Sequence, residues 1–229
     1  MRLDQFLQKT LGVSRQTARS ILKSKQVSVN GEMVKQAKHQ LDLAVDRVFY
    51  GQEPLVYQEF YYWMLNKPKG YVSSHIHDGG IPIYQLLEDF SHVEMHCAGR
   101  LDVDTTGLVL ITNNGQWSHR VAHPSQACFK RYRVMTQMPL SDDAIAALEK
   151  GVTLGNGEST LPATVVRLAD NEIELSICEG KFHQVKRMLK AVDNEVIDLH
   201  RLQIGAITLG DLAEGDYRAL TEAEIEEFA

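Results

Sequence analysis

The sequence predicts an α+β protein in which a small α/β domain, residues 1–58, precedes a larger domain, residues 59–229, with a mixed, mainly antiparallel β-sheet. Short apolar stretches recur at hairpin spacing in the larger part, with few helical stretches between them. A doubly wound parallel sheet would instead alternate strands and helices regularly. A chain of 229 residues is also long enough for one sizeable core and a smaller second one.

The first 58 residues show the local signals of two helices followed by a hairpin. Apolar residues at helical spacing predict a first helix, namely Leu3, Phe6, Leu7 and Leu11. Gly12 is expected to end it, and Ser14 is placed to cap a second helix. Asn30-Gly31 is a strong hairpin turn, a further strand is expected over residues 43–50, and residues 52–60 are expected to be a linker.

The larger domain is expected to contain more strands than helices. The predicted strands are residues 61–65, 94–98, 108–112, 132–136, 163–168, 173–178, 196–200 and 204–209. The predicted helices are residues 116–122, 142–150 and 181–192. Thr221 and Glu224 have the spacing of a capping box, which predicts a short last helix.

Charge is distributed unevenly along the chain. The net charge is −6, yet residues 1–58 hold nine Lys and Arg against five Asp and Glu, a net +4. Residues 210–229 alone carry −6. Arg15, Arg19 and Lys23 are spaced by four and therefore line one side of the second predicted helix. Such a row forms either a solvated face or a contact with phosphate, and both interpretations remain open at this point.

Several classes of protein are disfavoured by composition. No apolar run reaches the roughly 20 residues that a membrane span needs, and the N-terminus lacks the apolar stretch of a signal peptide. The three cysteines are far apart and predict neither disulfides nor a zinc site. His119 and His123 have a spacing that can bind zinc, but a third ligand is not evident. We therefore expect a cytoplasmic protein without a metal or cofactor.

The most unusual segment is HCAGRLDVDTTGLVLITNNG, residues 96–115, in which a polar loop lies between two apolar strands. One interpretation is a turn rich in Asp and Gly, because turns favour these residues. Another is the DxDxT signature of aspartyl phosphatases. That signature should follow a long apolar strand near the start of an α/β domain, whereas Gly99-Arg100 directly precede it here. A third interpretation is a loop that places a catalytic carboxylate, Asp102, at the mouth of a cleft.

Two resemblances decide between these interpretations. The first 50 or so residues resemble the S4 RNA-binding domain, with RLD at residues 2–4, SR at 14–15 and VSVNG at 27–31. The segment GRLDVDTTGLVLITNNG closely resembles the catalytic motif of RsuA-type pseudouridine synthases. Further motifs of that family follow the expected pattern, namely NKPKGYVSS at 66–74, KRYRV at 130–134, EGKFHQVKRM at 179–188, and LHR at 199–201 followed by IG at 204–205. Together the two resemblances cover nearly the whole chain.

The resemblance implies roles for particular residues. Asp102 would be the nucleophile, and Lys186 the cation that keeps it ionised, with Arg187 as the alternate. Tyr132 would stack on the uracil, and strand alternation places Arg131 and Arg133 on the opposite face. Contacts with the substrate or the RNA are expected at Arg100, His183, Arg187, Arg2, Arg15, Arg19 and Lys23. The loop residues Asp104, Thr105 and Thr106 are expected to brace the backbone, and Lys181 stands where the family more often has Arg.

The resemblance also implies the reaction and the partner. Pseudouridine is an isomer of uridine, so no cofactor is needed. The S4-like head, the length and the acidic C-terminal end resemble the members that act on 16S ribosomal RNA. The expected partner is thus 16S rRNA or an assembling small ribosomal subunit, bound by a monomer. The alternatives are action on 23S rRNA and a non-catalytic role in ribosome assembly.

Overall fold

The computed structural model describes residues 1–77, 79–87, 93–122 and 128–229. The chain divides into two compact units, the first built on Met1–Phe60 and the second on Tyr61–Glu88 and Met95–Ala229. Within the described ranges no helix is both long and apolar enough to cross a bilayer. Each unit is described separately below.

The first unit packs two helices against a four-stranded sheet. The helices are α1 (Leu3–Leu11) and α2 (Arg15–Lys23), and the sheet has the order β2-β1-β3-β4. Its strands are β1 (Val27–Val29), β2 (Glu32–Met33), β3 (Val48–Tyr50) and β4 (Glu53–Leu55). The Ser14 side chain accepts a hydrogen bond from the Thr17 backbone N–H, so the predicted cap of α2 is confirmed. Leu3, Phe6 and Leu7 are buried as the helical spacing predicted.

Two predictions for this unit were wrong in their bounds. The strand expected over residues 43–50 begins only at Val48, because Asp42 and Asp46 form a turn. The Asp46 carboxylate accepts a hydrogen bond from the Asp42 backbone N–H, which favours the turn over a strand. The expected linker also contains β4, which pairs with β3 at the edge of the sheet. Pro54 is tolerated there because an edge strand need not donate every backbone N–H.

The second unit is built on one large sheet with the order β11-β12-β10-β13-β9-β5-β15, while β14 pairs with β13 and β8 pairs with β9. The strands are β5 (Tyr62–Lys67), β8 (His96–Cys97), β9 (Thr106–Thr112), β10 (Lys130–Thr136), β11 (Thr164–Ala169), β12 (Glu172–Ile177), β13 (Val196–Ile204), β14 (Ile207–Thr208) and β15 (Tyr217–Ala219). All the described pairings in this sheet are antiparallel except β13 with β9. The predicted mixed, mainly antiparallel sheet is confirmed.

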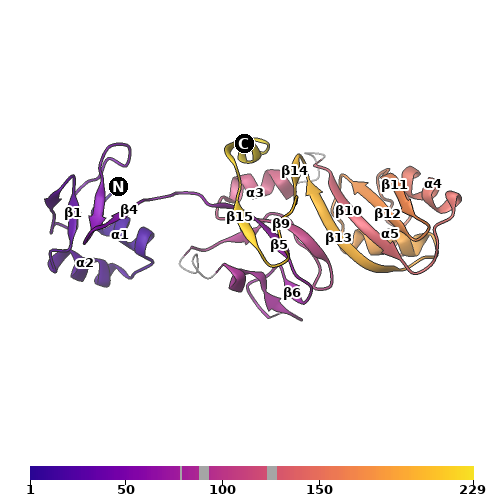
Figure 1. Cartoon of the computed structure of the whole chain (residues 1–229), viewed down its shortest axis with the longest axis horizontal. Helices are drawn as coiled ribbons and strands as arrows, with labels where there is room; N and C mark the ends of the chain where they lie inside the picture. Colours follow the sequence, from indigo (N-terminus) through magenta and orange to yellow (C-terminus); the bar gives the residue numbers. More distant parts are fainter. Residues whose placement is uncertain (78, 88–92, 123–127) are drawn as a thin grey trace. The chain divides into compact units, whose positions relative to one another are not determined.

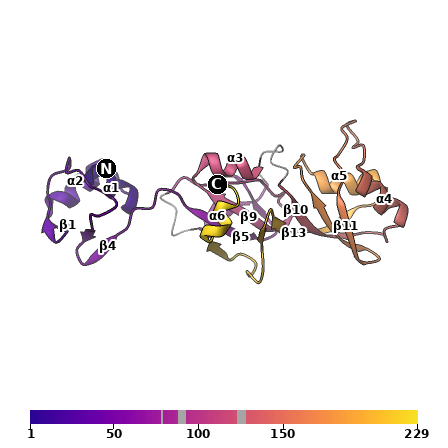
Figure 2. The same ribbon diagram turned by 90° about the horizontal axis from the view of Figure 1, so that it is seen from above.

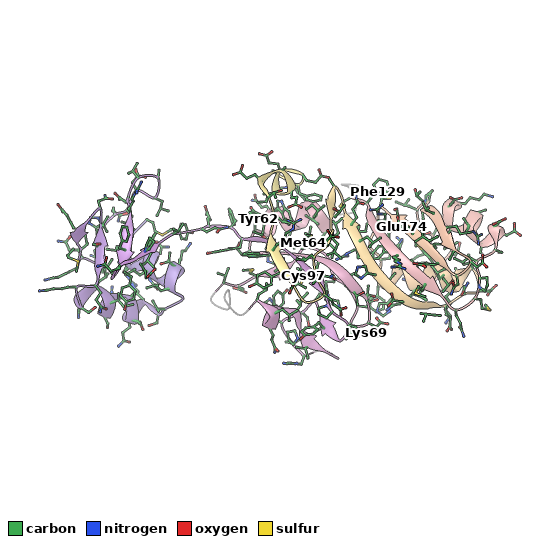
Figure 3. The ribbon with its side chains drawn as sticks, in the orientation of Figure 1. Tyr62, Met64, Lys69, Cys97, Phe129 and Glu174 are labelled. Carbon is green, nitrogen blue, oxygen red and sulfur yellow. The ribbon has the colours of Figure 1, made fainter. Side chains whose placement is uncertain are left out.

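Helices cover two different parts of this sheet. Figures 1 and 2 show α3 (Gly115–Ala122) beside β5 and β9, and α4 (Asp142–Lys150) with α5 (Gln184–Ala191) beside β10 to β12. Two short strands, β6 (Tyr71–Val72) and β7 (Ile81–Pro82), form a small parallel pair, followed by a 3-10 helix, η1 (Ile83–Leu86). The last helix, α6 (Glu222–Glu226), has the predicted capping box between Thr221 and Glu224. Side chains project from both faces of the large sheet, with Glu174 of β12 labelled in Figure 3.

Several boundaries in the second unit differ from the prediction, most of them by one or two residues. Helix α5 begins at Gln184 and not at residue 181, because His183 adopts a left-handed φ of 49° that a helix cannot contain. Strand β13 continues to Ile204, so the strand expected over residues 204–209 is only β14 after a turn at Gly205. The strand expected over residues 94–98 is only β8.

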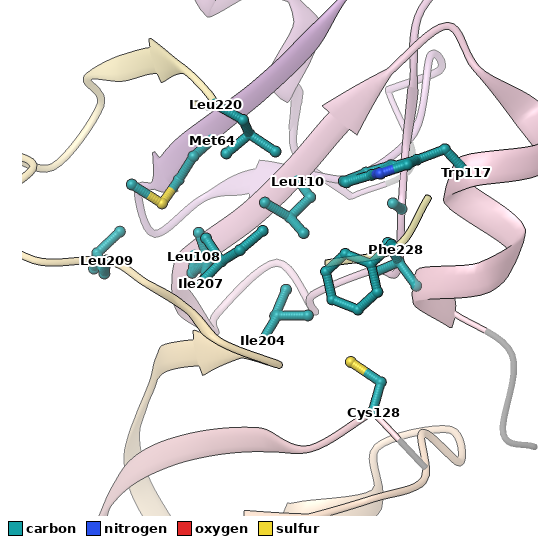
Figure 4. Packing of buried hydrophobic residues seen from close by; sticks show 12 residues of the cluster. Met64, Leu108, Leu110, Trp117, Cys128, Ile204, Ile207, Leu209, Leu220 and Phe228 are labelled. Atoms are coloured by element: carbon teal, nitrogen blue, oxygen red, sulfur yellow. The ribbon is translucent and has the colours of Figure 1, made fainter. Parts of the chain in front are cut away.

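One hydrophobic core of the second unit lies between β5, β9, the β13–β14 hairpin and α3. Figure 4 shows Met64, Leu108 and Leu110 packed with Trp117 and Phe228, which come from elements far apart in the sequence. The Trp117 indole N–H donates to the Ile225 carbonyl at 2.9 Å, so α6 is fixed to this core. The acidic C-terminal end is thus part of the fold, since β15 also pairs with β5.

Candidate active site

A cavity of about 800 Å³ opens beside the loop that joins β8 to β9. Residues 98–105 of this loop line one side, and residues 179–186, at the start of α5, line the other. The inner wall is formed by β10, β12 and β13, which contribute Lys130, Tyr132, Ile177, Leu199, Arg201 and Ile204. The cavity therefore brings together five of the sequence motifs that lie far apart along the chain, since residues 72–74 also line it.

The loop that carries Asp102 is held on both sides by the segment that follows β5. The Leu101 backbone N–H donates to the Ser73 hydroxyl at 3.2 Å, and the Gly70 N–H donates to the Val103 carbonyl at 2.8 Å. The fully buried Lys67 donates through Nζ to the carbonyls of Pro68 and Tyr71, at 3.0 and 2.7 Å. The motif at residues 66–74 thus fixes the backbone before and after Asp102.

The Asp102 carboxylate contacts two side chains from the region of α5. Lys186 Nζ lies 2.9 Å from Asp102 Oδ2 and 2.6 Å from Asp104 Oδ1, so one ammonium serves two carboxylates. His183 Nε2 lies 3.3 Å from Asp102 Oδ1. Burial disfavours the charged form of Lys186, but the hydrogen bonds to both carboxylates outweigh it and raise its pKa. Burial likewise opposes the charge of Asp104, but Lys186 holds the pKa of that carboxyl below its usual value.

The other loop residues brace the backbone only in part as expected. The Thr105 backbone N–H donates to the Asp102 carbonyl at 3.2 Å, and Thr106 Oγ1 lies 2.8 Å from His200 Nδ1 on β13. Asp104, expected to bind backbone N–H groups, instead directs its carboxylate to Lys186. The loop consequently presents two carboxylates to one cation.

Two further side chains stand at the mouth of the cavity. Arg100 is exposed and lines the cavity directly before Leu101 and Asp102. The ring of His183 stacks on Phe182 at a centroid distance of 3.7 Å, and 76% of Phe182 is exposed. An exposed aromatic ring beside a cavity offers a surface on which another planar group can stack.

Tyr132 lies on the inner wall, as strand alternation predicted. It is buried together with Lys130 and Val134, whereas Arg131 and Arg133 point to the other face of β10. There Arg131 and Arg133 pair with Glu174 and Glu172 of β12. The pairing of Tyr132 with Arg201 on β13 places the two side chains as neighbours at the cavity.

Arg187 lies away from the cavity lining. Its guanidinium contacts the Asn156 side chain, the Glu158 carboxylate and the Phe182 carbonyl. Lys181 does line the cavity, and its ammonium lies 3.1 Å from Glu179 Oε2. No group of three or more His, Cys, Asp or Glu that could hold a metal is found among the described residues, and His123 lies outside them.

In the first unit, three of the four candidate RNA-binding residues gather around one buried carboxylate. Arg2 makes two hydrogen bonds to Asp4, and Arg15 and Arg19 approach Asp4 Oδ2 to 3.6 and 4.0 Å. Burial opposes the charge of Asp4, but Arg2 and Arg15 together hold its pKa below the usual value. Lys23 is exposed in the last turn of α2.

Sequence analysis missed three buried cations at or beneath the cavity, namely Lys67, Lys130 and Arg201. Burial lowers the pKa of Lys67 to about 8, although the carboxylates of Asp104 and Asp102 act in the opposite direction. Alternation along β10 would have placed Lys130 on the face of Tyr132. For Arg201 the signal was its place in the LHR motif at residues 199–201, because residue type alone predicts that a charged residue in a strand is exposed.

Two family models match the sequence. Residues 1–46 match the S4 domain, and residues 61–191 match the RNA pseudouridylate synthase model. These segments contain the arginine cluster around Asp4 and the loop that carries Asp102, respectively. A crystal structure described as a pseudouridylate synthase also superposes with a TM-score of 0.71, at 42% identity and with full coverage of both chains.

Curated relatives show the same similarity over nearly their whole length. The proteins from Salmonella typhimurium and Escherichia coli K12 named "Ribosomal small subunit pseudouridine synthase A" are each 46% identical over 228 residues, which is 98% of this chain and 98% of theirs. The Haemophilus influenzae protein of that name is 44% identical over 230 residues, 99% of this chain and 98% of its own. The chain therefore belongs to the RNA pseudouridylate synthase family, and it is an isomerase with an N-terminal S4 domain.

Proposed function

We propose that this protein converts one specific uridine of 16S rRNA into pseudouridine, with Asp102 as the catalytic group and without a cofactor. The observation that carries the proposal is the Asp102 carboxylate, 2.9 Å from the Lys186 ammonium, in the wall of a cavity that also contains Tyr132. The names of the relatives, which share 46% identity over 98% of the chain, support the small subunit as the source of the RNA.

The reaction breaks the N1–C1′ bond of uridine, turns the base and joins C5 to C1′. Asp102 serves this reaction in either of two ways, by attacking C1′ or by taking the C2′ proton. Both ways require a carboxylate, and the Lys186 ammonium donates a hydrogen bond to it at 2.9 Å. The backbone contacts of Leu101 and Val103 keep the carboxylate in place while the base moves.

The remaining groups of the cavity act on the nucleotide. The base has to leave the RNA stack to reach Asp102, at a cost of a few kcal/mol. In this proposal Tyr132 stacks on the extruded uracil, and the exposed Arg100 holds the RNA backbone or fills the space left by the base. His183 and its stacked neighbour Phe182 contact the RNA at the mouth.

The S4 domain would provide most of the affinity for RNA. Arg2, Arg15, Arg19 and Lys23 supply its positive charge, and each phosphate contacted contributes about 0.7–0.9 to the slope of log affinity against log salt. Since Asp102, Tyr132 and Lys186 come from one chain, we propose that the protein acts as a monomer. We further propose that it acts in the cytoplasm, on 16S rRNA or on an assembling small subunit. Arg187, which binds Asn156 and Glu158, would orient residues 156–158 and not the substrate.

The test is single-turnover pseudouridine formation with the wild type and Asp102→Asn. The RNAs are 16S and 23S rRNA, each naked and as ribonucleoprotein, with pseudouridine mapped by carbodiimide and primer extension. Asp102→Asn is expected to form no product yet to bind RNA nearly as well. Asp104→Asn is the matched variant, since it removes the second carboxylate on Lys186 and leaves Asp102 in place. It should retain product formation at a reduced rate.

Each outcome has a distinct meaning. One new site in 16S rRNA that disappears with Asp102→Asn would support the reaction, the residue and the substrate. A site in 23S rRNA would keep the enzyme and overturn the choice of RNA. Normal turnover by Asp102→Asn would refute the role of that residue. Tight RNA binding without product on any RNA would favour a non-catalytic role in ribosome assembly.

A further inference from the structure

The inner wall of the cavity contains two buried cations that the mechanism above does not use. Lys130 is 9% exposed and Arg201 is 3% exposed, and both line the cavity with Tyr132. They come from the neighbouring strands β10 and β13, on which Tyr132 is paired with Arg201. Lys130 lies two residues before Tyr132 and therefore on the same face of the sheet.

Neither cation has an acidic partner among the described residues. Arg201 Nε donates to the Leu108 carbonyl at 2.7 Å, while its buried Nη2 has no hydrogen-bond partner in the described part of the chain. Burial lowers the pKa of Lys130, and the titratable groups that act on it after burial are Cys128, Arg201 and Cys178, none of them a carboxylate. The nearby Glu179 is already engaged, because it accepts from Gln184 and pairs with Lys181.

Burying two unpaired cations in one wall is unfavourable for the empty protein. An unpaired buried charge is strongly unfavourable, and a guanidinium cannot avoid this by losing its proton. Such an arrangement is explained if a bound group brings negative charge to the wall during the reaction. A preorganised cation in a cavity with little water stabilises such a charge far more than it would in water.

The reaction proposed above generates such a charge, and the inference rests on that proposal. When the N1–C1′ bond breaks, its electron pair stays on N1, so the detached uracil becomes an anion with charge spread over N1, O2 and O4. On one route C1′ becomes bonded to an Asp102 oxygen. On the other route Asp102 takes the C2′ proton and a C1′–C2′ double bond forms. The charge on the base is the same in both.

We propose that Lys130 and Arg201 bind the detached uracil anion and hold it in the cavity while it turns from N1 to C5. The unpartnered Nη2 of Arg201 donates to a uracil carbonyl oxygen, and Lys130 provides the second positive charge. When C5 then bonds to C1′, the electron pair of the new bond comes from the base, and the Asp102 bond breaks or the C2′ proton returns. The base is then neutral, with both C1′ and a proton on C5. The freed Asp102 carboxylate accepts the C5 proton and N1 takes up a proton, so the product is an isomer of the substrate with the same net charge.

This role predicts an effect on rate without an effect on binding. The bound uridine is neutral before the bond breaks, so the two cations interact more strongly with the transition state than with the substrate. Removing a donor that stabilises a developing anion typically costs about 10²–10³-fold in rate. Lys130→Gln and Arg201→Gln should each slow single-turnover conversion by about 10²-fold or more, with the dissociation constant for RNA changed less than about twofold.

The experiment compares two substrates to separate this role from a structural one. One RNA carries uridine at the target position and the other carries 5-fluorouridine, whose base is a more stable anion because fluorine withdraws electrons. Cleavage of the N1–C1′ bond is followed by nuclease digestion and mass spectrometry of the remaining N1-linked nucleoside. The rate deficit of Lys130→Gln and Arg201→Gln should be several-fold smaller on 5-fluorouridine. Lys130→Arg and Arg201→Lys should restore part of the rate.

A matched control lies on the same strand. Arg133 lies on the face of β10 opposite to Lys130 and Tyr132, where it pairs with Glu172. Arg133→Gln therefore removes a cation outside the cavity, and this variant should convert both substrates at the wild-type rate. Thermal unfolding of every variant reports whether the fold is retained, and Arg201→Lys serves where Arg201→Gln does not fold.

The outcomes separate this inference from the function on which it rests. A wild type that forms no pseudouridine on any rRNA would refute the proposed function itself. An active wild type with unaffected Lys130→Gln and Arg201→Gln variants would overturn the inference alone. An equal deficit on uridine and 5-fluorouridine, or a loss confined to RNA affinity, would also overturn it and assign the two residues to structure or to binding.

Discussion

The carboxylate of Asp4 organises the cationic surface of the S4 domain, and replacing it with the neutral, isosteric Asn tests this role. Asp4 is almost fully buried, with 2% of its side chain exposed, and it receives two hydrogen bonds from Arg2 at 3.0 and 2.7 Å. Arg15 and Arg19 reach the same oxygen from successive turns of α2. Asp4→Asn therefore removes one negative charge, one of the two oxygens that accept from Arg2, and the carboxylate with which Arg15 and Arg19 pair.

The loss of the negative charge and the loss of the carboxylate change the affinity for RNA in opposite directions. Removing a negative charge strengthens attraction to phosphate, but only by about 0.5 kcal/mol at roughly 8 Å in water, and salt reduces this further. Losing the acceptor frees the arginines, and ordering each long side chain again on binding costs about 0.5–1.5 kcal/mol. For two or three side chains the second effect is about 1–4.5 kcal/mol, so it exceeds the first.

We therefore expect Asp4→Asn to bind rRNA about tenfold more weakly, although it is the more positively charged protein. The assay is fluorescence anisotropy of the full chain with a 16S rRNA fragment over a series of salt concentrations. Glu32→Gln is the matched control, because it makes the same change of charge at an exposed position of the same unit. Circular dichroism establishes that both variants are folded. Equal or tighter binding by a folded Asp4→Asn protein would refute the argument.

Two further predictions concern stability. A Cβ at Gly107, where φ is +101°, would lie 2.3 Å from the Arg201 carbonyl oxygen, so Gly107→Ala should lower the free energy of unfolding in urea by about 3 kcal/mol or more. Hydrogen bonds from Arg218 lower the pKa of Glu224 to about 2, and the pair therefore stabilises the fold above pH about 4.5 and loses this effect as the pH falls toward 2. Glu224→Gln should cost about 2 kcal/mol at pH 7, after allowance for partial exposure, and little near pH 2, as measured by urea unfolding at each pH.

The chain offers a matched control for each of these variants. Gly115→Ala adds a Cβ with no atom within 4 Å at the start of α3, and it should leave the stability nearly unchanged. Glu226→Gln removes an exposed carboxylate of the same helix α6 and should show no comparable dependence on pH. Equal losses in Gly107→Ala and Gly115→Ala would refute the steric argument, and a pH-independent loss in Glu224→Gln would refute the ion-pair argument.

Local patterns in the sequence predicted much of the fold because local interactions determine those features. The Ser14 cap, the Asn30-Gly31 hairpin and the alternation around Tyr132 each depend on residues a few positions apart. The mainly antiparallel sheet followed from many short strands at hairpin spacing. The proximity of Asp102 and Lys186, 84 residues apart, came instead from the family resemblance.

The features that were missed depend on contacts between distant segments. Helix α5 starts late because His183 adopts a left-handed conformation next to Asp102, and periodicity within residues 181–192 contains no trace of this. The pairing of β15 with β5 makes the acidic C-terminal end part of the sheet, although its composition indicated only a charged tail. Arg201 is buried because it lies in a central strand beneath a cavity, whereas residue type alone favours exposure.

The parallel contact between β9 and β13 connects these observations. It joins Thr106 to His200 and Gly107 to Arg201, directly after the loop that carries Asp102. Only a residue without Cβ allows the Arg201 backbone to approach so closely at this position. The same contact therefore sets the position of the Asp102 loop relative to the strand that places Arg201 in the inner wall. One glycine thus fixes the distance between the carboxylate proposed to open the glycosidic bond and the guanidinium proposed to receive the detached base.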